Sequence, residues 1–346
     1  MENICNTEEA TPRREVEMMR KLATPMLLLL VAVTVFGCSA TAKPNIPDVQ
    51  ETPHVDVEPI GETTEPSLTA AFMAMVDNHS AARPQYGLAK ADVVYEFICE
   101  TGITRFLAAF YSRDPIRVGP IRSIRYYYLH VARAYDLPLA HVGGNMDALA
   151  LREPLAIKSI CDITNAGSAF LIDPTRSRPH NTYITSESLL DVAASRGYAS
   201  SALPELPEGD FVATQSATKV QITYSPGYKV SWVYQPTTQH YSRLINERTH
   251  VTAEQEEIIA QNIIIIEAPV RTVEVPVDGI QSEIEVIGAG KALFLRNGKL
   301  ANGTWRKSKS EAHFEYQLED GTRFTYAPGS VWIQQVHSLA RDVVYE

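Results

Sequence analysis

The residues best suited to chemistry in this 346-residue chain lie in one stretch, "RDPIRVGPIRSIR", from Arg113 to Arg125. Four arginines surround a Gly-Pro step in it: Arg113, Arg117, Arg122 and Arg125. Guanidinium groups present planar, paired N–H donors that match the oxygens of phosphate and carboxylate. The stretch therefore predicts either an anion-binding site or a network of ion pairs that stabilises the domain.

A helix N-terminus is expected at the Gly-Pro step, because Pro120 suits the first position of a helix. The free N–H groups of the first turn, up to Ser123, would then face an anion that the helix dipole favours. The same dipole disfavours a cation, so Arg122 in the first turn is a poor choice for helix stability. This misfit indicates that an acidic partner or a bound ligand lies beside the arginines.

Two further loops carry matching residues, "HVGGN" at 141–145 and "DPTRSRPHN" at 173–181. If the loops meet at one end of a sheet, their side chains would line a polar cleft. The predicted ligand-binding residues are Arg117, Arg122, Ser123, Arg125, His141, Asn145, Arg178, His180 and Asn181.

Acidic partners for these arginines are available on the first predicted strand, at Glu96 and Glu100. The two carboxylates share a face of the strand but stand roughly 13 Å apart, too far for the direct acid pair of a glycosidase. We expect them to neutralise the arginines across a hairpin.

Other enzyme signatures are weak. The sequence contains no G-x-S-x-G, H-E-x-x-H or phosphate-binding loop motif and no C-x-x-C zinc spacing. His141 and His180 with Asp147 or Asp173 would suit a metal, but ordinary loop and core histidines explain them better. We predict no metal and no cofactor, and His180 as the catalytic residue if the protein is an enzyme.

In the first half of the chain, predicted strands alternate with predicted helices. "ADVVYEFIC" and "ITRFLAAFYS" read as a hairpin around "ETG", followed by a helix from Pro120 that ends before Pro138. "LPLAHVGGN" is typical of a buried strand entering a Gly-Gly turn, and "SESLLDVAASRGY" of a helix closed by Gly197. These segments predict an α/β or α+β domain at 68–199.

A polar connector is predicted at 200–212, and after it the spacing of apolar residues changes to one typical of strands. Short strands dominate the rest, with Asn297-Gly298 and Asp320-Gly321 as hairpin turns, and only "TAEQEEIIAQN" competes as a helix. We predict a smaller, β-rich second domain at 213–340.

In the body of the chain Cys99 and Cys161 either form a disulfide or are buried thiols.

The N-terminus resembles an export signal. Arg20 and Lys21 precede an apolar run and then "VFGC", which ends at Cys38 and resembles a bacterial lipobox. We predict an over-long start and a lipoprotein signal at 1–38, with lipidation of Cys38; the alternative is an uncleaved signal anchor. The proline-rich segment 39–67 reads as a disordered tether that would extend about 90 Å.

The net charge of −10 argues against nucleic acid as a partner. Residues 1–66 hold 5 Lys+Arg and 11 Asp+Glu, which leaves 26 and 30 in the remainder, so the body is nearly neutral.

The combination of "VGPIRSIR", "VGGN", "RPHN", "GTWRK" and "GSVWI" resembles the YerB-like family of bacterial lipoproteins, over about residues 68–336. The resemblance implies an exported, membrane-anchored protein with two domains, but no activity, because the family is defined by domains of unknown function.

We therefore expect a lipid anchor at the extracytoplasmic face of the bacterial membrane and binding of an anionic cell-envelope component in the Arg/His cleft. Two alternatives remain: a hydrolase or transferase acting on an envelope phosphoester or glycan, and a scaffold that binds a partner protein.

Overall fold

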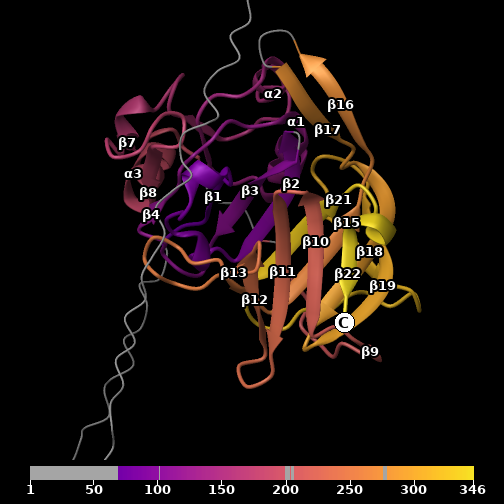
Figure 1. Ribbon diagram of the computed structural model, residues 1–346. Helices are drawn as coiled ribbons and strands as arrows, with labels where there is room; N and C mark the ends of the chain where they lie inside the picture. The colour runs from indigo at the N-terminus through magenta and orange to yellow at the C-terminus, as the bar shows by residue number, and fades with distance from the viewer. Residues whose placement is uncertain (1–68, 101, 199–202, 204–205, 276–278) are drawn as a thin grey trace, which may run out of the picture. The chain divides into compact units, whose positions relative to one another are not determined.

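The computed structural model describes residues 69–100, 102–198, 203, 206–275 and 279–346. The predicted signal with Cys38, the predicted tether and residues 200–202 and 204–205 of the predicted connector lie outside the described residues. Strands make up most of the structure, with a few helices among them (Figure 1).

The largest sheet contains strands from both halves of the chain. Its 11 strands follow the order β20-β19-β18-β15-β21-β2-β3-β1-β5-β6, with β9 paired to β19. The strands are β1 (Phe72–Asp77), β2 (Val93–Glu100), β3 (Ile103–Phe110), β5 (Leu139–His141), β6 (Ser159–Cys161), β9 (Gln215–Ser216), β15 (Asn262–Glu267), β18 (Gly288–Arg296), β19 (Lys299–Lys307), β20 (Glu315–Leu318) and β21 (Val331–Val336). Strand β2 runs parallel to β21, with Val93 opposite Val331. The two halves therefore share one sheet, which the sequence pattern did not indicate.

Three smaller sheets complete the strands. A six-stranded sheet comprises β10 (Lys219–Ser225), β11 (Tyr228–Gln235), β12 (His240–Ile245), β13 (Arg248–Thr249), β14 (Ile259–Ala260) and β22 (Val343–Tyr345). A two-stranded sheet comprises β16 (Val270–Val275) and β17 (Gly279–Ile284). A three-stranded sheet comprises β4 (Arg117–Val118), β7 (Phe170–Ile172) and β8 (Thr182–Thr185).

The helices are short and lie mainly in the first half. They are α1 (Tyr126–Tyr135), α2 (Met146–Leu151), α3 (Ser186–Ser195) and α4 (Leu339–Asp342), with 3-10 turns at Ser80–Ala82, Leu88–Lys90 and Gly167–Ala169. Within the described ranges, none of the helices has the length and apolar content needed to cross a membrane.

The core has apolar residues on both faces of the main sheet. Strand β15 shows the reason: Ile263 and Ile265 join one buried cluster while Ile264 and Ile266 join the other. Successive side chains of a strand point to opposite faces, so a continuous apolar run fits a strand covered on both sides. Helix α1 contributes Tyr128 and other buried residues to the second cluster.

Several predicted elements are confirmed. The hairpin of β2 and β3 forms with Gly102 at φ 69°, and α3 ends before Gly197 at φ 67°. Asn297 and Gly298 join β18 to β19 with φ of 52° and 70°, the left-handed pair that a tight hairpin turn requires.

Two predicted helix segments are wrong. Helix α1 begins at Tyr126, not at Pro120, because the backbone before it is extended and hydrogen-bonds to neighbouring strands. "TAEQEEIIAQN" forms turns and strand rather than a helix, since Ile259 and Ala260 pair with β12.

Candidate functional site

A buried carboxylate organises the candidate site. Asp77, at the end of β1, is 3% exposed, and its Oδ2 accepts a hydrogen bond from His180 Nδ1 at 2.7 Å. Arg122 Nε lies 3.2 Å from the same oxygen, and the backbone N–H of His79 donates to Oδ1 at 2.9 Å. The imidazole rings of His79 and His180 stack with centroids 4.6 Å apart. We call Asp77, His79, Arg122 and His180 the Asp77 cluster.

Strand pairing fixes the positions of these residues. The N–H of Asp77 donates to Pro120 O at 2.8 Å, and the N–H of Arg122 donates to Met75 O at 2.9 Å. The N–H of Ile121 donates to Thr182 O at 2.7 Å, two residues after His180. The segment before α1 is thus held between β1, which ends at Asp77, and β8, which begins two residues after His180.

The predicted helix N-terminal anion site is therefore wrong. The N–H groups of Ile121 and Arg122 are bound to carbonyls, and Ser123 lies outside any helix. The side chain of Arg122, not the backbone beside it, carries the positive charge toward Asp77.

A second acid holds the neighbouring arginines, as predicted for Glu100. Its Oε1 accepts hydrogen bonds from Arg105 at 3.3 Å and from Arg125 at 3.1 Å. The other terminal amino groups are also occupied, because Arg105 Nη1 donates to Ser123 O and Arg125 Nη1 donates to Ile124 O. Both terminal amino groups of each arginine are therefore engaged, although Arg125 Nε is buried without a hydrogen-bond partner.

Arg122 differs from them. Within the described residues neither of its terminal amino groups has a hydrogen-bond partner, and its side chain is 19% exposed. Burial and the nearby charges of Arg105 and Arg125 lower the pKa of Arg122, against the opposing effect of Asp77. The guanidinium thus pairs with Asp77 by charge alone, since Nε is buried without a hydrogen-bond partner, and it lies beside two other cations.

Glu96, predicted as a partner of these arginines, instead forms a buried pair with an arginine of the second half. Arg243 Nη2 lies 2.8 Å from Glu96 Oε2, and both side chains are 0% exposed. Tyr228 donates to Glu96 at 2.6 Å, and Gln334 donates at 2.8 Å. Asn78, next to Asp77, donates to Tyr228 at 2.6 Å. The network joins the Asp77 cluster to the second half of the chain.

Arg117, Arg178 and Asn181 lie apart from the contacts of the Asp77 cluster. Arg117 occupies the corner between the perpendicular rings of Tyr86 and Tyr183, 4.4 and 4.2 Å from their centroids. Arg178 is exposed. Asn181 is buried and donates to Asp173 O at 3.4 Å.

His141 and Asn145 have structural partners. His141 is fully buried between Ser159 Oγ at 2.7 Å and Gly143 O at 2.8 Å. Asn145 caps α2 by accepting from Ala148 N–H and also donates to Gln281 of β17 at 3.1 Å. Of the two loops predicted to line the cleft with the arginines, 141–145 and 173–181, only the second, through His180, contributes to the Asp77 cluster.

The thiols of Cys99 and Cys161 are free and buried, so these residues do not form the disulfide that the sequence left open.

Sequence reasoning missed Asp77, His79 and Arg105. An acid at the end of an apolar strand, "FMAMVDNH", is the signal that was present for the first two. Arg105 lies inside the predicted hairpin strand, where period-2 alternation alone does not distinguish it from a solvent-facing residue.

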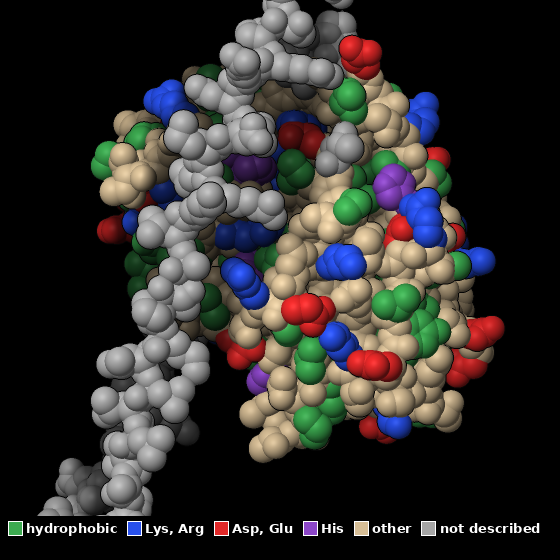
Figure 2. Space-filling view, in the orientation of Figure 1, with side chains coloured by type: hydrophobic (Ala, Val, Ile, Leu, Met, Phe, Trp, Pro, Cys, Tyr) green, Lys and Arg blue, Asp and Glu red, His purple; other side chains and the backbone are tan. Residues whose placement is uncertain are grey.

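The surface has a hollow that contains charged side chains. Figure 2 shows Lys/Arg, Asp/Glu and His side chains gathered in its depth, above the ends of β10 and β11.

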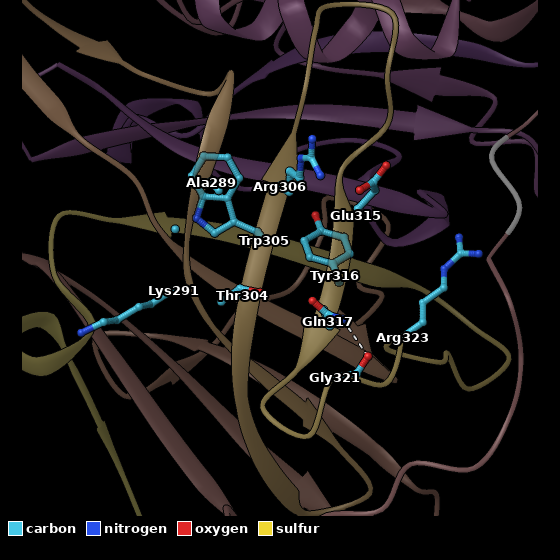
Figure 3. Close-up of a pocket in the computed structure, with 11 residues that line it drawn as sticks. Ala289, Lys291, Thr304, Trp305, Arg306, Glu315, Tyr316, Gln317, Gly321 and Arg323 are labelled. Atoms are coloured by element: carbon cyan, nitrogen blue, oxygen red, sulfur yellow. Dashed lines mark hydrogen bonds between the residues drawn. The ribbon is translucent and has the colours of Figure 1, made fainter.

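Another hollow, of about 890 Å³, lies on β18, β19 and β20. Its lining includes three cations, Lys291, Arg306 and Arg323, and Lys291 extends away from Arg323 (Figure 3). Trp305 in its floor is 1% exposed and donates to Glu267 O, so the ring is not free to stack on a ligand. The cations do not converge, which favours the Asp77 cluster as the candidate site.

The fold and the sequence together define the class of protein. Residues 60–199 match the N-terminal domain and residues 220–333 the C-terminal domain of a family described as "Protein of unknown function (DUF3048)", and the chain belongs to this two-domain family. It is similar to "Putative lipoprotein YerB" of Bacillus subtilis (strain 168), with 28% identity over 332 residues that cover 93% of this chain and 97% of the relative. The crystal structure of the YerB protein from Bacillus subtilis matches with a TM-score of 0.71 and 28% identity, over 80% of this chain and 93% of that chain. The resemblance inferred from the motifs is confirmed.

Proposed function

We propose that this protein is a lipid-anchored envelope protein that binds an anionic group of a cell-envelope component at Arg122 and His180. The lipobox-like "VFGC" and the name of the relative, a putative lipoprotein, support the anchor at Cys38 and the extracytoplasmic location. The anchor would hold the binding site within reach of wall and membrane-surface polymers.

One observation carries the binding proposal: the half-buried guanidinium of Arg122 lies 3.2 Å from Asp77 at Nε as an ion pair, and none of its nitrogens forms a hydrogen bond with a described residue. Burial and the ion pair restrict this side chain, so less conformational entropy is lost when an anion binds its unpartnered N–H groups. His180, hydrogen-bonded to Asp77 through Nδ1, has Nε2 available as a second contact.

The test is calorimetric titration of the full-length protein in detergent with phosphate-bearing wall fragments. Arg122→Ala is expected to lower the affinity at least tenfold, because a charge-assisted hydrogen bond contributes about 1.5–3 kcal/mol. Arg306→Ala is the matched control, because Arg306 is an exposed residue of β19, and it is expected to bind like the unaltered protein. Equal affinity in the Arg122 and Arg306 variants would refute the site.

An envelope hydrolase or transferase is the second candidate, favoured by the 2.7 Å contact of Asp77 and His180. A carboxylate on Nδ1 orients the imidazole and fixes its tautomer, the arrangement of a general acid and base. Turnover of an envelope phosphoester that is lost in His180→Gln while binding persists would favour this candidate over a binding protein.

A further inference from the structure

The charges around the Asp77 cluster do not balance. Arg243 is neutralised by Glu96 and Arg122 by Asp77, but Arg105 and Arg125 share the single carboxylate of Glu100. That sharing leaves one positive charge without an acid of its own.

Arg83 supplies a second uncompensated charge. Its Nε and Nη2 donate to Asn78 Oδ1 at 3.1 Å and Asn78 O at 2.7 Å, both uncharged acceptors. Its guanidinium carbon lies 5.0 Å from the centroid of the Tyr228 ring. Burial and the charge of Arg243 lower the pKa of Arg83, while Tyr228, Glu96 and Asp77 act in the opposite direction.

The excess is therefore two positive charges: five arginines (83, 105, 122, 125 and 243) stand against three carboxylates (77, 96 and 100), and 5 − 3 = 2. Structural ion-pair networks usually approach neutrality, because each unpaired charge removed from water carries a desolvation penalty. An excess of positive charge beside a partly exposed guanidinium favours the binding of an anion from solution.

His79 adds a neutral donor to the same place. Its Nδ1 accepts from Ala81 N–H at 3.2 Å, so the ring proton of the neutral form resides on Nε2. The ring stacks on His180 and is half-buried. Arg122, His79 and Arg83, which contact Asp77 or its neighbour Asn78, thus carry N–H donors, and three separate donor side chains suit a tetrahedral oxyanion better than a flat carboxylate.

We propose that the Asp77 cluster selects a tetrahedral dianion, the terminal phosphate monoester or sulfate class, over a monoanion such as a phosphodiester or carboxylate. The inference rests on the proposed function and specifies its ligand. The shared chemistry of sulfate and phosphate monoester allows a simple probe.

The experiment compares sulfate with methanesulfonate, a tetrahedral monoanion of similar size, by titration of the full-length protein in detergent at fixed ionic strength. Sulfate is expected to bind at least about tenfold more tightly, because its second charge faces the excess of arginine. Arg122→Ala is expected to abolish binding of both.

Two variants change the charge balance in opposite directions. Arg83→Gln lowers the excess to about one charge and is expected to reduce the preference for sulfate several-fold, whereas Glu100→Gln raises it and is expected to increase that preference. A variant that merely damaged the site would weaken both anions in both cases. Arg306→Gln serves as the matched surface control.

The outcomes separate the two claims. Equal affinities for sulfate and methanesulfonate, both lost in Arg122→Ala, would overturn dianion selection and leave the anion site in place. Binding of neither anion, or binding unchanged in Arg122→Ala, would overturn the site and the dianion inference with it.

Discussion

At the scale of single residues, the candidate site depends on how each arginine is compensated. Arg105 and Arg125 are structural, since their amino groups bind Glu100 and backbone carbonyls. The guanidinium of Arg122 has an ion pair with Asp77 and no hydrogen bond to a described residue. The sequence identified the right group of arginines, but residue type alone cannot show which guanidinium retains free donors, because that depends on carbonyls and acids brought in from other strands.

The buried pair of Glu96 and Arg243 gives the first stability prediction. Arg243→Met is expected to cost about 3–5 kcal/mol, because it leaves a carboxylate buried without its cation. The double variant Glu96→Gln/Arg243→Met should recover a large part of that loss. Urea unfolding of the single and double variants measures both values; a double variant that is no more stable than Arg243→Met would contradict this explanation.

At the scale of elements, the sequence predicted the turns and helix ends that depend on the conformational preference of a single residue. The hairpin turns at Gly102 and Gly298 and the end of α3 at Gly197 follow from glycine's access to positive φ. The start of α1 was misplaced because Pro120 suits both a helix start and an extended segment, and the choice was made by pairing with β1 and β8. The parallel pairing of β2 with β21 joins residues more than 200 positions apart, which no short-range pattern reports.

Gly298 tests the turn argument. Its φ is 70°, and a Cβ there would lie 2.7 Å from the Tyr234 ring, so Gly298→Ala is expected to destabilise the fold by about 1–2 kcal/mol. Gly227→Ala is the matched control, because an added Cβ at Gly227 meets nothing within 4 Å. Thermal unfolding of the two variants should differ by several degrees, and equal losses would show that neither strain nor crowding at Gly298 matters.

At the scale of the whole molecule, buried polar groups hold the two halves together. His250, 4% exposed, contacts Arg243 through Nδ1 at 2.6 Å and Gln85 through Nε2 at 2.9 Å. Gln85 in turn donates to Asp77 O at 3.0 Å. The second half of the chain thereby contributes to the position of the Asp77 cluster, consistent with a site that is incomplete in the first half alone.

This arrangement predicts acid sensitivity. Burial, followed by the charges of Arg243 and Arg83, holds the pKa of His250 well below its usual 6.5. The unfolded chain then binds the proton more readily, so the contribution of neutral His250 is fully present above about pH 6.5 and declines as the pH falls below it. The free energies of unfolding at pH 7.5 and pH 5.5 should differ less in His250→Gln than in the unaltered protein. An equal difference in the two proteins would exclude His250 as the cause of the acid sensitivity.

The most direct test of the central claim is a crystal of the protein soaked in selenate, with anomalous diffraction used to locate the anion. The structure predicts a selenium peak within hydrogen-bond distance of the terminal amino groups of Arg122, beside His79 and His180, and its absence in Arg122→Ala. Selenate bound only at exposed cations such as Lys291 and Arg323, with none at Arg122, would contradict the account.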